Sequence, residues 1–180
     1  RELPDGTMLI NTSEQPEDII IPVGDKMPAK ATTYVKYKSN LNSNTPIPID
    51  PNNPTDIERS NGTVHTTAIK VYDTKGNTHN LILEFNKVSE NRWRVVAKVP
   101  DAIEGSVRVD VTNPTPDGDN TFFINFDNRG TIISVEDGSG TNRDILNEGQ
   151  LNINVIFNVD DGTLDAQGNP IGQQQTVRLD

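Results

Sequence analysis

Alternating hydrophobic and polar positions predict a run of β-strands in the middle of the chain. Apolar residues recur at every second position in residues 69–72 and 81–85, which is the pattern of strands with one buried face. Between the two runs, residues 73–77 (Asp-Thr-Lys-Gly-Asn) supply the residue types that form tight reversals. A second reversal leads into residues 93–95. The pattern therefore predicts a three-stranded antiparallel meander.

The same alternation predicts further strands on both sides of this meander. In residues 33–38, Val35 and Tyr37 share one face, whereas Tyr34 and the two lysines share the other. Helical periodicity is hard to find, because proline or glycine interrupts many of the candidate windows. We therefore expect an all-β fold. The remaining predicted strands are residues 107–111, 122–126, 131–135, 151–157 and 176–179.

A proline-rich stretch separates the first predicted strand from the meander. Residues 46–54 contain four prolines, which fix φ and donate no backbone hydrogen bond. We expect this stretch to be a stiff, extended connector outside any sheet interior. It is also the best candidate for a domain boundary.

Composition agrees with short strands joined by polar loops. Hydrophobic residues make up 32% of the chain and aromatic residues 5%, with 13 glycines and 12 prolines. The net charge of −10 argues against nucleic acid and anionic membrane surfaces as partners, because neutralising phosphates requires clustered Lys and Arg. Cysteine is absent, which excludes disulfides and thiolate metal sites within this sequence.

Few residues in the chain suggest a metal site. His65 and His79 lack the spacing of a zinc site, so we expect both to be ordinary strand or surface histidines. The Asp-rich stretches 117–120 and 160–165 could bind calcium, but neither follows the twelve-residue loop with its closing glutamate. Because Asp and Gly are also common turn formers, we predict plain turns there, and neither a metal nor a cofactor.

Catalytic and glycan-binding chemistry are equally sparse. The chain has no Gly-x-Ser-x-Gly elbow, and no carboxylate pair can be assigned an acid–base role from sequence, so we predict that it is not an enzyme. Trp93 and Tyr72 could form a sugar-binding platform, but we expect them, with Phe85, to be core residues. The alternative function, from a different class, is a calcium- or glycan-binding β-sandwich adhesin module.

One block also resembles a known family. Residues 71–79 (Val-Tyr-Asp-Thr-Lys-Gly-Asn-Thr-His), a hydrophobic strand and Asn-Arg-Trp at 91–93 are similar to the middle region of bacterial flagellar hook proteins. Residues 27–42, 125–132 and 175–180 resemble other hook segments and occur in the expected order. The motif residues, for which the resemblance implies a structural role, are Tyr72, Asp73, Gly76, Asn77, His79, Phe85 and Trp93.

The resemblance implies a structural subunit that assembles with copies of itself into the hook, the universal joint that transmits motor torque to the filament. Hook cap, rod and hook–filament junction proteins would be its other partners, at a site outside the cytoplasm (extracellular, or periplasmic in a spirochaete). Segments resembling the terminal heptad helices of the family are not found here. We therefore interpret the chain as the surface-exposed middle of a hook subunit and expect it to be monomeric in isolation.

The resemblance also suggests a domain division. We expect an outer β-barrel or sandwich domain over residues 46–158. A smaller, discontinuous inner β domain would combine residues 1–45 with residues 159–180, whose short strand would return the chain to the inner domain.

The segment from Lys30 to Leu41 looks spirochaetal. Hook subunits of spirochaetes are joined by lysinoalanine, which forms from a lysine amine and a dehydroalanine derived from cysteine. Because this chain has no cysteine, either no such link forms or another residue replaces the cysteine, and Ser43 is the position we consider. The alternative interpretation of Lys30 is an ordinary solvated lysine before a strand.

Overall fold

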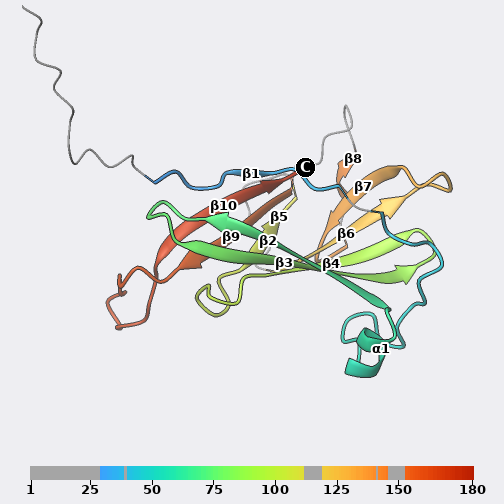
Figure 1. Ribbon diagram of the computed structural model, residues 1–180, viewed down its shortest axis with the longest axis horizontal. Coiled ribbons are helices and arrows are strands. Elements are labelled where there is room, and N and C mark those ends of the chain that lie inside the picture. The colour runs from blue at the N-terminus through green and yellow to red at the C-terminus, as the bar shows by residue number, and fades with distance from the viewer. Residues whose placement is uncertain (1–28, 39, 112–118, 141, 146–152) are drawn as a thin grey trace, which may run out of the picture.

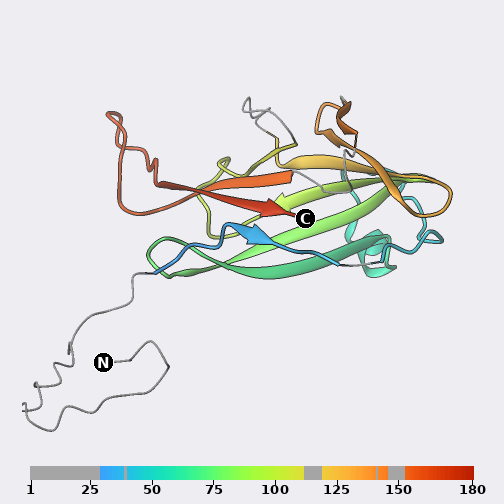
Figure 2. The ribbon, with the colours of Figure 1, turned by 90° about the horizontal axis from the view of Figure 1, so that it is seen from above.

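Two β-sheets face each other and enclose a common core (Figures 1 and 2). The computed structural model describes residues 29–38, 40–111, 119–140, 142–145 and 153–180. Within these ranges the chain is almost entirely β, with one short helix. The predicted all-β class is confirmed, in the form of a sandwich-like arrangement of two sheets.

The larger sheet contains the predicted meander. Its six strands lie in the order β2-β3-β4-β6-β7-β8, and every neighbouring pair is antiparallel. The register places Ile69 opposite Leu81 and Phe85 opposite Val95, so the alternating apolar positions share one face. The strands are β2 (Val64–Tyr72), β3 (Thr78–Ser89), β4 (Arg92–Lys98), β6 (Thr121–Phe126), β7 (Ile132–Asp137) and β8 (Asn142–Ile145).

The smaller sheet joins segments that are far apart in sequence. Its order is β1-β10-β9-β5, formed by β1 (Tyr34–Val35), β10 (Gln173–Leu179), β9 (Ile153–Val159) and β5 (Arg108–Asp110). The last strand, β10, matches the predicted return strand and pairs parallel to β1 and antiparallel to β9. This pairing joins strands from both sides of the expected domain boundary at residue 159. The division into two domains stays a prediction. Residues 1–28 of the expected inner domain lie outside the described part of the chain.

The core lies between the sheets and draws side chains from both. Trp93 and Phe85 belong to it, as predicted, and each is only 4% exposed. The same prediction for Tyr72 is wrong, because that side chain is 47% exposed. Its neighbour Val71 occupies the inward position, and successive side chains of a strand point to opposite faces.

The proline-rich stretch lies outside both sheets but is not extended throughout. Pro48 and Pro54 are buried, and the Asn86 side chain donates a hydrogen bond to the Pro51 carbonyl. Directly afterwards the chain forms α1 (Asp56–Ser60), which the sequence analysis missed. Thr55 and Glu58 form a reciprocal capping box at its start, and this Thr-x-x-Glu spacing was the available sequence signal.

Candidate functional site

The Asp-x-x-Gly reversal at Asp73–Asn77 has counterparts with the same hydrogen bonds elsewhere in the described residues, at Asp127–Thr131 and Asp165–Asn169. In each turn, Oδ1 of the first aspartate accepts backbone N–H groups from the residues two and four positions later, all at 2.8 Å. The glycines at the fourth position have φ values of 86°, 80° and 85°, a region that other residues rarely adopt. The repeated turn was not recognised from the sequence, although the Asp-x-x-Gly spacing is visible there.

The first of these turns differs from the other two because its aspartate is buried and contacts a histidine. The ring of His79 lies between two carboxylates, with Nδ1 2.5 Å from Oδ2 of Asp101 and Nε2 3.4 Å from Oδ2 of Asp73. The Phe157 ring meets the imidazole nearly edge-on, at 6.1 Å between centroids. His79 therefore connects the turn to the β4–β5 loop and to the smaller sheet.

Asp73 is held in its charged form by these contacts. Burial raises the pKa of its carboxyl, but hydrogen bonds from Asn77, His79 and Lys75 outweigh burial, and the pKa falls below its ordinary value. The Asn77 side chain donates to the second carboxylate oxygen at 2.9 Å. The motif residues from Tyr72 to His79 thus lie around one turn, whereas Phe85 and Trp93 lie in the core further along β3 and β4.

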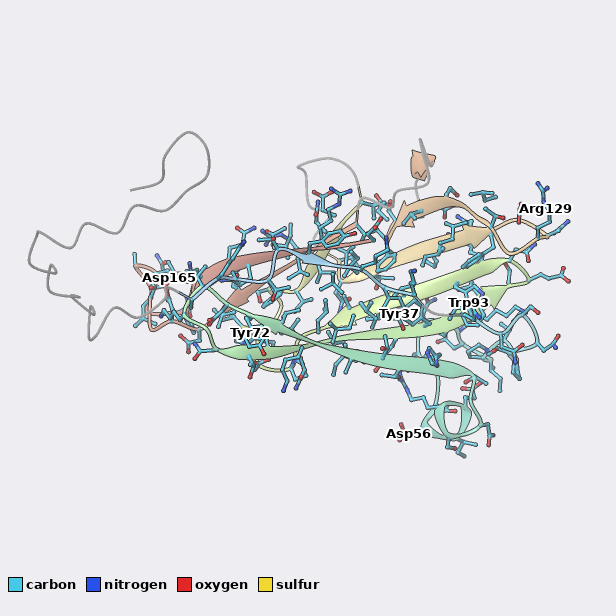
Figure 3. The ribbon with its side chains drawn as sticks, turned by 45° about the horizontal axis from the view of Figure 1, so that its top comes forward. Tyr37, Asp56, Tyr72, Trp93, Arg129 and Asp165 are labelled. Atoms are coloured by element: carbon cyan, nitrogen blue, oxygen red, sulfur yellow. The ribbon has the colours of Figure 1, made fainter. Side chains whose placement is uncertain are left out.

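The strands give the molecule two distinct ends. The loop end carries the β2–β3 turn and the β9–β10 loop, residues 160–172. A hydrogen bond of 2.8 Å from Thr74 of the turn to Gln173, the first residue of β10, joins the two segments. The helix end carries α1 and the β3–β4 and β6–β7 turns. Figure 3 shows Asp165 and Asp56 of α1 far apart, on opposite sides of the molecule. At about 3.3 Å per residue, the twelve residues of β3 alone separate the two ends by about 35 Å.

Charged side chains fasten α1 to the outer face of the larger sheet. Arg59 of the helix contacts Glu84 of β3 at 3.0 Å, and Lys98 of β4 contacts the same carboxylate at 2.8 Å. Burial raises the pKa of Glu84, but the two cations outweigh burial and the pKa lies below its ordinary value. The Arg59 guanidinium also donates to the Pro54 carbonyl. The helix is therefore held in place although none of its residues is buried.

Lys30 and Ser43, the two cross-link candidates, are both exposed and lie at opposite ends. Lys30 precedes Thr32, whose backbone N–H donates to the Tyr72 carbonyl beside the β2–β3 turn. Ser43 lies at the other end of β3, because its carbonyl accepts a hydrogen bond from the buried Lys87. The structure thus does not bring the two residues together within one molecule.

The metal and glycan interpretations gain no support from the described residues. Among them, no group of three or more His, Cys, Asp or Glu side chains could hold a metal ion. In the stretch 160–165, each aspartate accepts backbone N–H groups of its own loop, as expected for turns. Residues 117 and 118 of the other Asp-rich stretch lie outside the described part. Exposed Tyr72 and buried Trp93 are too far apart to form a sugar platform (Figure 3).

The helical content of the described residues gives no sign of a membrane span. In these parts of the chain, the structure has no helix long and apolar enough to cross a bilayer.

Comparison with known proteins identifies relatives over most of the chain. The flagellar hook protein FlgE of Treponema pallidum is 37% identical over 138 residues, 75% of this chain and 29% of that protein. FlgE of Borreliella burgdorferi is 32% identical over 175 residues, 97% of this chain and 34% of that protein. FlgE of Escherichia coli is 27% identical over 126 residues, 69% of this chain and 27% of that protein. The chain spans about a third of the length of these relatives.

A family model gives the same result. Residues 40–180 match the flagellar basal body protein FlaE D2 domain. The resemblance to flagellar hook proteins that the sequence suggested, with spirochaetes among the relatives, is thereby confirmed. The chain belongs to the family of the FlaE D2 domain of flagellar hook proteins.

Proposed function

We propose that this chain is the D2 part of a structural subunit of the bacterial flagellar hook, and that it has no enzymatic role. The match of residues 40–180 to the D2 domain carries this proposal, because the relatives named above are hook proteins. The subunit assembles with copies of itself into the joint that transmits motor torque to the filament. A calcium- or glycan-binding adhesin is not favoured by any described feature.

The remaining partners and the location follow from the same proposal. A hook subunit meets rod proteins at one end of the tube, junction proteins at the other, and the hook cap during assembly. It lies outside the cytoplasm, in the periplasm if the source is a spirochaete. The D2 part is exposed on the tube, and the acidic composition, with a net charge of −10, suits a solvated surface.

Immunogold electron microscopy tests this proposal directly. Antibody raised against the chain is expected to label a short curved segment between rod and filament in native cells, because the epitopes lie on the hook surface. Preimmune serum and cells that lack the hook gene serve as controls. Label spread over the whole cell surface would contradict the hook assignment and favour an adhesin.

We also propose that Lys30 and Ser43 serve in a covalent link between subunits. Loss of water from Ser43 would give dehydroalanine, and addition of the Lys30 amine to its β-carbon would form lysinoalanine. The two residues flank opposite ends of β3 and are therefore separated by about 30 Å, at about 3.3 Å per residue. A lysine side chain cannot cover this distance, so the link must join two molecules.

Mass spectrometry of digested native hooks tests the link. The expected product is a peptide pair that joins Lys30 to Ser43 and weighs one water less than its two parts. The variant Lys30→Arg is expected to abolish this product, because guanidinium is a far poorer nucleophile, whereas Lys36→Arg, at another exposed lysine, should retain it. Hooks that dissociate completely into unlinked subunits would refute the link.

A further inference from the structure

Exposed apolar side chains gather at both ends of the molecule. At the helix end, Ile49 is 96% and Ile57 73% exposed, and Ile47 is about half exposed. We refer to these three residues as the isoleucine cluster. At the loop end, Leu164 and Ile171 are each about half exposed, and we refer to them as the loop pair. Single exposed apolar residues are ordinary, but such groups on rigid supports are typical of contact surfaces.

The isoleucine cluster is held rigidly. The backbone N–H of Ile49 donates to Glu58 of α1 at 2.7 Å, which fixes this residue beside the helix that carries Ile57. Glu58 also closes the capping box, and Arg59 fastens the helix to Glu84 of the sheet. The isoleucines therefore project from a support that loses little conformational entropy on binding.

The loop pair is supported in a similar way. Leu164 forms a β-bridge with Pro170, and the N–H of Ile171 donates to the Thr163 carbonyl at 3.0 Å. The Asp165–Asn169 turn closes this small hairpin. Asn158 of β9 donates to the Ile171 carbonyl, which fastens the hairpin to the sheet. The two apolar groups lie at opposite ends of the molecule, beside α1 and beside the Asp165–Asn169 turn, and Figure 3 shows Asp56 and Asp165 of these two segments far apart.

We propose that the isoleucine cluster of one copy packs against the loop pair of the next copy. This inference rests on the proposed function, since a tube of identical subunits is an open helical assembly. Such assemblies require a head-to-tail contact between two different surfaces of each subunit. The two apolar groups satisfy this requirement because one lies at each end. A second copy is therefore the occupant that suits both surfaces.

The composition of the two surfaces indicates a weak contact. Five side chains cover far less than the ~800 Å² per partner of a stable complex, so the contact forms only where many subunits are already aligned. Carboxylates outnumber cations at both surfaces. The helix end has Asp56 and Glu58 beside Arg59, which already pairs with Glu84, and the loop end has Asp160, Asp161 and Asp165 beside Lys75. Apolar packing must therefore hold the contact against repulsion, which salt screens.

Disulfide trapping in hooks assembled from the full hook protein tests this contact. The chain has no cysteine of its own, so Ile57→Cys and Leu164→Cys introduce the only thiols in this region. After mild oxidation, the double variant is expected to give a ladder of covalent multimers on a denaturing gel. Either single variant should stay mostly monomeric. The matched control combines Ile57→Cys with Ile133→Cys, because Ile133 is also half exposed but lies on β7.

The outcomes separate this contact from the hook assignment. Hooks that form and give no more multimers than the control pair would overturn the contact and leave the hook function intact. Failure of the unmodified protein to form hooks would instead overturn the proposed function. Multimer yield is expected to rise with sodium chloride. A yield that falls with salt would mean that ion pairs hold the copies together, which contradicts apolar packing.

Discussion

The variant Phe157→Ala is expected to lower the free energy of unfolding of this chain by about 3–5 kcal/mol. The Phe157 side chain is 1% exposed, points inward from β9 and belongs to the core shared by the two sheets. Its removal would leave a cavity and would also take away the ring against which His79 packs. Urea unfolding followed by far-UV circular dichroism measures this loss.

The matched control is Ile133→Ala on β7, where about half of the side chain is exposed. This change should cost less than about 1 kcal/mol, because an exposed site leaves no cavity. Equal losses at the two positions would show that Phe157 does not lie in a close-packed core. A Phe157→Leu variant should recover part of the loss, since it restores much of the missing volume.

The strands were predictable because a strand with one buried face alternates apolar and polar residues, and this alternation is visible in the sequence. The predicted apolar positions of the meander lie on its inward face in the expected register, although the buried His79 and Lys87 share that face, and the predicted return strand appears as β10. One core prediction departed from this alternation and was wrong. Tyr72 was assigned to the core by its aromatic character, although alternation with Val71 points it outward. Position along the strand is the better guide than residue type here.

The candidate surfaces were harder to predict because they depend on contacts between distant residues. His79 was recognised as part of a turn motif, but its partner Asp101 lies 22 positions away in a loop without a pattern of its own. The helix α1 has five residues, too few for a helical stripe, and only its capping box could have revealed it. The exposed isoleucines were likewise not identifiable, since an isoleucine is buried by default in a sequence-based prediction.

The variant Asp73→Ala is expected to cost about 2–3 kcal/mol, because it leaves partly buried donors of Lys75, Asn77 and His79 without an acceptor. The turns that begin at Asp127 and Asp165 provide matched controls within the same chain. Asp127→Ala and Asp165→Ala remove the same backbone hydrogen bonds from exposed turns, where water can replace the lost acceptor. Both controls should therefore cost clearly less than Asp73→Ala in urea unfolding, and equal costs would refute a special role for the buried Asp73 carboxylate.

The pH dependence of stability tests the charge on Asp73 separately. Because the folded state lowers the pKa of Asp73, its carboxylate stabilises the fold above the unfolded value of about 3.9. That contribution is lost as the pH falls below this value and through the lower folded pKa. The Asp73→Asn variant has no carboxyl to protonate at position 73. The difference in unfolding free energy between this variant and the native chain should therefore shrink as the pH falls through this window. Glu84 and Asp127, whose pKa values are also lowered, titrate in both proteins and cancel in the difference. A deficit that stays constant with pH would mean that Asp73 acts through its shape and hydrogen-bond acceptors, and not through its charge.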